Sequence, residues 1–352
     1  MFRWLCHALA QALYPDPDDT APVWPDDPAD VEALVTLSGH HLVTPALARA
    51  LRGNDTVPLQ AAEYLEAALY LNRQRNDQIL SGLEIALRAL SEVGVVPILL
   101  KGGANLVDGL YPDPAMRIVG DLDLLVAPDS ASAASEALSR AGFDDFGEAV
   151  PPPVPYARHH HLPMQSHRES GVGIEIHHSV LPAPSDRMLD AAQLRRRALP
   201  LAFGGRAVAL PSPTDRVLHN IVHDQLVDGA YHRRSANLRQ LLDLSLLCHR
   251  HRGAIDRGEL EVAFAGRKAR VLTYALDLTG LVETSPPTGK SSASIERLRK
   301  GIEHPRSLLR MGLQDTATRV IRQPGIALNF LAPRTWGNRA RHWASLARGP
   351  RA

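Results

Sequence analysis

Two aspartates, Asp121 and Asp123, stand one residue apart at the beginning of a short apolar run over residues 121–126. Because side chains alternate across a β-strand, these carboxylates share one face, and Leu122 and Leu124 share the other. Two carboxylates on one face repel each other unless a cation lies between them. A hard divalent ion such as Mg²⁺, which prefers oxygen ligands, removes that conflict. The pattern predicts a strand that carries a metal site, whereas a solvated strand end explains the two aspartates taken alone.

A second apolar run, residues 95–100, precedes the aspartates and leads into Lys101, Gly102 and Gly103. Such a run is typical of a strand covered on both faces, and a short helix is expected over residues 104–110. The N–H groups at the start of a helix attract an anion, and glycine lets a phosphate approach closely. A phosphate-binding turn is one interpretation, with Lys101 adding a positive charge. For these three residues alone, an ordinary strand–helix turn is the better explanation.

A third acid, Glu175, lies in the segment GVGIEIHHS, which has the character of another strand. Ile174 and Ile176 share one face of this strand, so Glu175 and His177 share the other. A carboxylate on an otherwise apolar strand costs free energy unless it has a partner. Either this strand has one face in water, or Glu175 joins the two aspartates at one site.

A Gly-Gly turn, a helix, an Asp-x-Asp strand and a later strand with a third acid follow one another in this chain. In that order the sequence resembles the DNA polymerase β-like nucleotidyltransferase superfamily. More narrowly, LLKGGANL, YPDPAMRIVGDLDLLV, EIHHSVL and LRQLLDLS resemble the uncharacterised bacterial nucleotidyltransferase family, which has a Lys-Gly turn, an Arg shortly before its Asp-x-Asp and a Glu-x-His strand. The resemblance covers residues 30–250, and its specific motifs lie in 101–126 and 174–177.

The resemblance implies an α+β fold, with a small mixed sheet in a polymerase β-like domain flanked by helical regions. It implies that Asp121, Asp123 and Glu175 bind two Mg²⁺ ions, which activate the attacking oxygen and stabilise the leaving pyrophosphate. The reaction expected is transfer of a nucleoside monophosphate, AMP in the first instance, from ATP or another NTP to a hydroxyl-type acceptor. The acceptor is left open among a small molecule, a peptide, a protein and RNA. The alternative is a non-catalytic nucleotide-binding or scaffold module that keeps the fold.

Further matches surround the three acids. Lys101, Gly102 and Gly103 are expected to hold the nucleotide phosphates, and His177 is expected to line the nucleotide site. Arg117, which precedes the aspartates, is expected to neutralise charge on the triphosphate. The stretch YPDPAMR separates the glycines from the aspartates more widely than in compact superfamily members, and it is expected to form a loop over the site.

Several other histidines raise the alternative of a zinc site. The run at residues 159–161, with His167 nearby, has the ligands that zinc accepts. It lacks a CxxC or HExxH framework, and adjacent histidines on a strand point to opposite faces, so a place beside the substrate is favoured over zinc. His219 and His223 are spaced i, i+4 on a predicted helix, where core or interhelical hydrogen bonding is commoner than metal binding. The same spacing predicts a helix salt bridge between Arg239 and Asp243, and all four helix residues are expected near the acceptor by analogy alone.

The chain of 352 residues is long enough for several compact units. We expect an N-terminal helical region at 1–93, including one long helix or two joined ones from residue 59 to 92. An α/β catalytic domain at 94–205 follows, and then a C-terminal helical region at 206–352. The end of the chain is rich in arginine and contains Trp336 and Trp343. Such a basic tail is suited to weak contact with RNA, although a disordered tail is the favoured explanation.

Composition and the two cysteines indicate the class of protein and the compartment to expect. The formal net charge is +1, with 45% hydrophobic and 22% charged residues, which is ordinary for a soluble globular protein. Cys6 and Cys248 are far apart, which fits a reducing compartment and offers no cysteine zinc site. No apolar run is long enough for a bilayer, and His7 and Gln11 interrupt the N-terminal apolar stretch, which predicts an amphipathic helix rather than a signal peptide. The cytoplasm is therefore the expected location.

Overall fold

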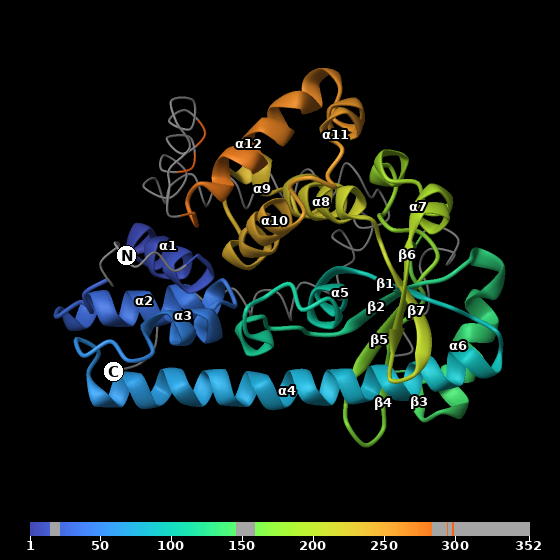
Figure 1. The fold of residues 1–352 in the computed structure, drawn as a ribbon, viewed down its shortest axis with the longest axis horizontal. Helices are drawn as coiled ribbons and strands as arrows, with labels where there is room; N and C mark the ends of the chain where they lie inside the picture. The colour runs from blue at the N-terminus through green and yellow to red at the C-terminus, as the bar shows by residue number, and fades with distance from the viewer. Residues whose placement is uncertain (15–21, 146–158, 284–293, 295–297, 299–352) are drawn as a thin grey trace, which may run out of the picture.

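A mixed β-sheet lies in the half of the molecule away from the N-terminal helices (Figure 1). The computed structural model describes residues 1–14, 22–145, 159–283, 294 and 298. Its seven strands are β1 (Ile98–Leu99), β2 (Leu122–Leu125), β3 (Phe143–Asp145), β4 (Gln165–His167), β5 (Gly173–His177), β6 (Leu199–Phe203) and β7 (Arg206–Leu210). Their order is β3-β4-β5-β2-β1-β7-β6. The pairs β2–β5 and β1–β7 are parallel and the other neighbours are antiparallel. The predicted α+β class with a small mixed sheet is confirmed.

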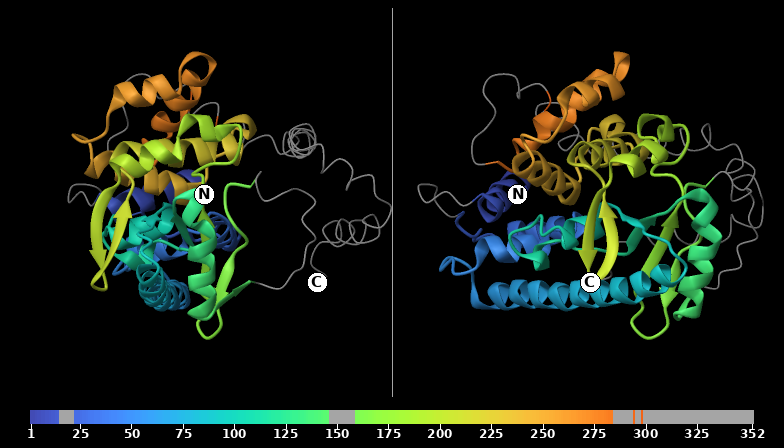
Figure 2. Two further views of the ribbon diagram at one scale, coloured as in Figure 1. Left: turned by 90° about the vertical axis from the view of Figure 1, so that its right-hand side faces the viewer. Right: turned by 45° about the vertical axis from the view of Figure 1, so that its right-hand side comes forward.

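Helices flank this sheet on both sides in sequence, as predicted. Those of the described residues are α1 (Phe2–Leu13), α2 (Pro28–His40), α3 (Thr44–Leu51), α4 (Leu59–Glu92), α5 (Lys101–Val107), α6 (Ala131–Arg140), α7 (Ala191–Arg197), α8 (Pro213–Ile221), α9 (Ala230–Arg233), α10 (Leu238–Arg250), α11 (Arg257–Ala263) and α12 (Ala269–Thr279). A π-helix, Val222–Val227, continues α8. Figures 1 and 2 show α4 along one side of the molecule and α8, α10, α11 and α12 on the opposite side.

The single helix α4 connects two hydrophobic cores. Leu65 and Leu69, in its first half, belong to the core shared with the N- and C-terminal helices. Ile79 and Leu83, in its second half, belong to the core beneath the sheet. Gly82 allows close packing here, since a Cβ at this position would lie 2.8 Å from Cγ1 of Val172. The structure thus confirms helix over 59–92 and selects one long helix over two joined ones.

Helix α5 begins earlier than the sequence predicts. Lys101, Gly102 and Gly103 form its first turn instead of a turn before it. A Cβ on Gly103 would lie 2.8 Å from Cδ1 of Leu99 and 3.1 Å from Cδ2 of Leu122, so this glycine lets α5 lie against β1 and β2. Packing alone therefore accounts for Gly103, while its part in phosphate binding stays a prediction.

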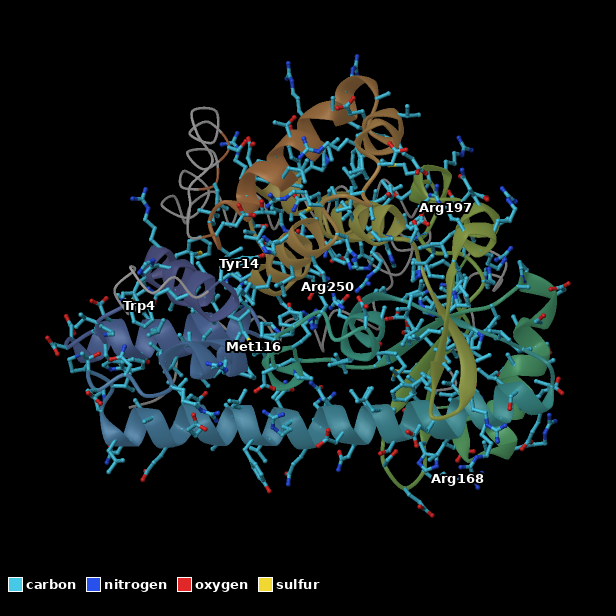
Figure 3. All side chains as sticks on the ribbon, viewed as in Figure 1. Trp4, Tyr14, Met116, Arg168, Arg197 and Arg250 are labelled. Atoms are coloured by element: carbon cyan, nitrogen blue, oxygen red, sulfur yellow. The ribbon has the colours of Figure 1, made fainter. Side chains whose placement is uncertain are left out.

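The loop after α5 packs against the N-terminal helices, and its expected place over the site stays a prediction. Tyr111 and Met116 are buried in the core shared with the N-terminal helices, and Figure 3 shows Met116 beside them. Nδ2 of Asn72, on α4, donates a hydrogen bond of 2.6 Å to the carbonyl oxygen of Ala115. The loop packs inward because burial of its large apolar side chains stabilises the folded state.

The boundaries of the predicted units are only partly visible. β7 joins the sheet through β1 and extends it to Leu210, beyond the predicted limit at residue 205. The division into three units stays a prediction. The proline run at 151–153 and the basic tail with Trp336 and Trp343 lie outside the described residues. Among the described helices, none combines the length and apolar character that a membrane span requires.

Candidate active site

The parallel pairing of β2 with β5 brings the predicted acids together. Asp123 is paired with Glu175 in this register, and Leu125 is paired with His177. Asp123, Glu175 and His177 each offer one donor atom, and these three atoms all lie within 4.8 Å of one another. Glu175 and His177 share a strand face with each other because they are two residues apart. The Glu-x-His spacing is therefore the signal in the sequence that His177 belongs to the cluster itself.

Asp121 lies at the edge of this cluster, just before β2. A Cβ built on Gly173 would lie 3.6 Å from Cβ of Asp121, so the aspartate is level with the start of β5. The pKa of Asp121 is raised by its burial and then by the negative charges of Asp123 and Glu175. This electrostatic coupling places Asp121 in the field of the other acids, while His177 takes the third position in the group of converging donor atoms.

Lys101 provides a positive charge inside the site. Its Nζ lies 2.6 Å from Oδ1 of Asp123, whose side chain is 4% exposed. Burial acts to raise the pKa of Asp123, but the Lys101 ammonium and His177 outweigh it and hold that pKa below its usual range. The backbone of Lys101 has φ +47°, a left-handed conformation that costs a non-glycine residue about 1–2 kcal/mol. The ion pair with Asp123 is an interaction that offsets this cost.

His177 is completely buried and has the environment of a ligand. Its Nε2 lies 2.9 Å from Oδ1 of Asp123 and 3.4 Å from Oε2 of Glu175. Neither contact has hydrogen-bond geometry, and both ring nitrogens are without a hydrogen-bond partner. Burial acts to lower the pKa of His177, but the two carboxylates outweigh it and raise that pKa.

The converging donor set fits a divalent cation. Two carboxylates supply the oxygen ligands that Mg²⁺ and Mn²⁺ prefer, and the buried imidazole supplies a nitrogen that Mn²⁺ or Zn²⁺ also accepts. An orphaned buried imidazole beside two acids is costly unless a proton or a metal joins them. The cluster is therefore a candidate metal centre, and the two-Mg²⁺ arrangement stays a prediction.

Part of the predicted histidine cluster reaches this centre. His161 forms an isolated antiparallel bridge with His177, and its ring centroid lies 5.2 Å from that of His177. The ring of His160 lies at the same distance from His177. Burial lowers the pKa of His160 to about 3, and His177 acts in the same direction. His167 lies elsewhere, with its ring 5.0 Å from that of Phe143.

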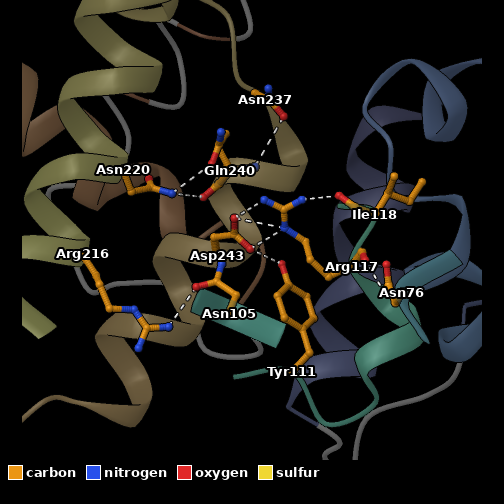
Figure 4. A network of polar contacts seen from close by, with 10 residues as sticks. All are labelled: Asn76, Asn105, Tyr111, Arg117, Ile118, Arg216, Asn220, Asn237, Gln240 and Asp243. Carbon is orange, nitrogen blue, oxygen red and sulfur yellow. Dashed lines mark hydrogen bonds and ion pairs between the residues drawn. The ribbon is translucent and has the colours of Figure 1, made fainter. Parts of the chain in front are cut away.

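Arg117 is engaged in a buried ion pair with Asp243 of α10 (Figure 4). Its Nε donates to Oδ1 of Asp243 at 2.9 Å and its Nη2 donates to Oδ2 at 2.7 Å. The hydroxyl of Tyr111 donates to the same carboxylate at 2.6 Å. The predicted contact between Arg117 and a triphosphate stays a prediction, and a Cβ on Gly102 would lie 3.5 Å from Nη2 of Arg117. The predicted Arg239–Asp243 salt bridge is wrong, since the buried fork geometry of Arg117 satisfies Asp243.

Comparison with known proteins defines the class. Residues 27–281, more than half of the chain, match the model of the family described as uncharacterised nucleotidyltransferase. The chain belongs to this family, and the predicted resemblance is confirmed.

Similarity to other known proteins is low. No curated protein matches the chain. Among solved structures, the crystal structure of an antigenic nucleotidyltransferase-like protein from Paracoccidioides brasiliensis is similar, with 15% identity and a TM-score of 0.38. That alignment covers 58% of this chain and 92% of that one.

Proposed function

We propose that this protein is a metal-dependent nucleotidyltransferase that moves AMP from ATP to a hydroxyl group of an acceptor and releases pyrophosphate. The observation that carries the proposal is the convergence of Asp123, Glu175 and His177 on adjacent parallel strands. Membership of a nucleotidyltransferase family supports the reaction class. The choice of AMP, of Mg²⁺ and of a hydroxyl acceptor belongs to the proposal.

The reaction balances without a covalent enzyme intermediate. The acceptor oxygen forms a bond to the α-phosphorus, the bond from that phosphorus to the bridging oxygen breaks, and pyrophosphate leaves with the electron pair. The acceptor proton passes to solvent. Asp123, Glu175 and His177 would hold the cation, with Asp121 at the edge of the site. When bound, the cation would increase the acidity of the acceptor hydroxyl and neutralise charge on the phosphates.

The start of α5 is suited to the triphosphate in this proposal. The first N–H groups of a helix have no partner within the helix and attract anions. In α5 these groups belong to Lys101, Gly102 and Gly103, and Lys101 already contacts Asp123. A nucleotide bound there would place its phosphates beside the metal cluster.

One observation favours the alternative of a non-catalytic module. The Lys101 ammonium neutralises Asp123 without any metal, so the acids do not by themselves require an ion. The two functions differ in what a nucleotide does. A catalyst transfers the AMP group to an acceptor, whereas a module only binds the nucleotide.

The test measures metal-dependent nucleotide binding and then transfer. A ligand that binds the native state raises the melting temperature, so ATP should raise it more with Mg²⁺ than without. The difference should disappear in Asp123→Asn and persist in Asp129→Asn, a control at an exposed position before α6.

ATP labelled at the α-phosphate should then label an acceptor in cell extract with the wild type and not with Asp123→Asn. Equal ATP stabilisation with and without Mg²⁺ would count against a metal centre, and binding without label transfer would favour the module.

A further inference from the structure

A pocket adjoins the metal cluster on the side of the C-terminal helices. It lies between α5, α8 and α10, and its lining includes Lys101, Asn105, Arg216, His219, His223 and Gln240. Lys101 belongs to both places, since its Nζ contacts Asp123. A molecule bound in this pocket would therefore lie next to the candidate metal centre.

The charged side chains that line the pocket, Lys101, Arg216 and Asp243, each have a charged partner. Arg216 donates from Nη1 to Oδ2 of Asp108 at 2.5 Å and from Nη2 to Oδ1 of Asn105 at 2.9 Å. Asp243, which also lines the pocket, is held by Arg117. The remaining polar groups of the lining are amides and imidazoles. An anionic ligand would meet Asp243 without an unpaired cation, and a cationic ligand would meet Lys101 and Arg216.

Several polar atoms of the same pocket lack partners. Nε of Arg216, Nε2 of His219 and Nδ1 of His223 are buried without a hydrogen-bond partner. Nδ1 of His223 does lie 3.2 Å from Oδ2 of Asp228, but this contact lacks hydrogen-bond geometry. A buried polar group left unsatisfied costs roughly 1–3 kcal/mol. Nε of Arg216 and Nε2 of His219 therefore offer a hydrogen-bonding ligand two unused positions in one pocket.

His219 is the residue best suited to meet a hydroxyl group. Its side chain is buried, with 4% of the residue exposed. Burial holds the pKa of His219 well below its usual range, and the charges of His223 and Lys101 act in the same direction. The ring is therefore neutral at pH 7, and one of its nitrogens can accept a hydrogen bond.

We propose that this pocket binds the hydroxyl-bearing end of the acceptor, that this end is uncharged, as in an alcohol or a polyol, and that Nε2 of His219 accepts the hydrogen bond of the hydroxyl group. This inference rests on the proposed nucleotidyl transfer and names its acceptor class. The hydrogen bond orients the hydroxyl oxygen beside the cluster of Asp123, Glu175 and His177.

Three matched probes test the charge of the acceptor. Glycerol, glycerate and 3-amino-1,2-propanediol share a three-carbon skeleton and are neutral, anionic and cationic at pH 7. The full-length protein is incubated with Mg²⁺, ATP and each probe, and the adenylylated product is measured by mass spectrometry. Glycerol should be adenylylated at least about tenfold faster than the two charged probes, because each of those leaves a charge unpaired in the pocket. Preference for a charged probe, or no product from any probe with protein that binds Mn²⁺ and ATP, would overturn the inference.

Substitution of His219 tests the hydrogen bond. His219→Phe keeps the ring and removes both nitrogens, and His219→Leu, which also lacks a hydrogen-bond acceptor, is the second variant in case phenylalanine disturbs folding. Both should lower kcat/KM for glycerol by about tenfold, the effect of one lost hydrogen bond, and leave Mn²⁺ and ATP affinity by calorimetry unchanged. His167→Phe, at a histidine packed on Phe143, is the matched control and should transfer normally. Normal glycerol transfer by a folded His219 variant would refute the assignment, whereas wild-type protein that binds neither Mn²⁺ nor ATP would refute the proposed function beneath it.

Discussion

At the scale of single residues, Lys101 occupies the position of a cation beside Asp123. Lys101→Met keeps the length of the side chain and removes its charge. A metal ion then no longer competes with the ammonium for the carboxylate, so Mn²⁺ should bind about tenfold more tightly, on the order of one pKa unit of electrostatic interaction. Without metal the variant should melt at a lower temperature, since the buried carboxylate loses its partner. Mn²⁺ titration by electron paramagnetic resonance measures the first effect, and calorimetry measures the second.

The control for this prediction is Lys268→Met, at an exposed lysine in the turn before α12. It should leave both quantities unchanged. Weaker Mn²⁺ binding in Lys101→Met would show that the lysine assists the metal or the nucleotide rather than competing with the ion.

Asp224 allows a prediction about pH away from the metal cluster. Burial raises the pKa of Asp224 to about 7, and the charge of Asp228 acts in the same direction, while the hydrogen bond from Gln225 opposes the change. An acid whose pKa is raised in the folded state holds its proton more tightly there, so the free energy of unfolding falls as pH increases from about 4 to 7. Asp224→Asn has no proton to lose at this position, so its unfolding free energy should not fall in this way. The variant should have a melting temperature at least about 3 °C above that of the wild type at pH 8 and close to it at pH 4.

Melting curves from pH 4 to pH 8 decide this prediction, with Asp77→Asn, at an exposed position of α4, as the comparison. Parallel curves for wild type and Asp224→Asn would contradict it. The buried acid lies in the π-helix that follows α8, a type of distortion that often occurs at functional sites.

At the scale of secondary-structure elements, α5 packs on β1 and β2 through Gly103. Gly103→Ala should lower the melting temperature, because the added Cβ would lie 2.8 Å from Cδ1 of Leu99 and overpacking costs about 1–3 kcal/mol. Gly39→Ala, in α2, has open space around its Cβ and should be neutral or stabilising. Calorimetric titration of folded Gly103→Ala with Mg-ATP then tests the phosphate role. Normal affinity with a lowered melting temperature would assign this glycine to packing alone.

The same elements show what the sequence can predict. Alternation along a single strand is enough to group Asp121 with Asp123, and Glu175 with His177. It does not reveal that β2 and β5 are parallel neighbours, because strand pairing depends on contacts distant in sequence. The predicted start of α5 is too late because two glycines suggest a turn, whereas here they allow a helix to approach a sheet.

At the scale of the whole molecule, a buried network joins the sheet side to the C-terminal helices. Arg117 and Asp243 are separated by 126 positions in the sequence. No local pattern links them, and the helical spacing of the sequence predicts Arg239 as the partner of Asp243 instead. Arg250, near the end of α10, adds a hydrogen bond of 2.7 Å to the carbonyl oxygen of Gly109, and Figure 3 shows it between α10 and α5. These contacts hold α10 against the segment that follows α5, and Asp243 also lines the proposed acceptor pocket.

This network predicts a strong dependence between its two charged residues. Arg117→Leu or Asp243→Leu alone leaves a buried charge without a partner, and each should cost about 3–5 kcal/mol of unfolding free energy. The double variant leaves neither charge and should cost less than the sum of the two, with a coupling of a few kcal/mol. Urea unfolding of the four proteins measures the cycle. Additive losses of unfolding free energy would show that the pair does not couple the two parts of the fold. Normal stability of Arg117→Leu together with weakened ATP binding would instead support the predicted contact of Arg117 with the triphosphate.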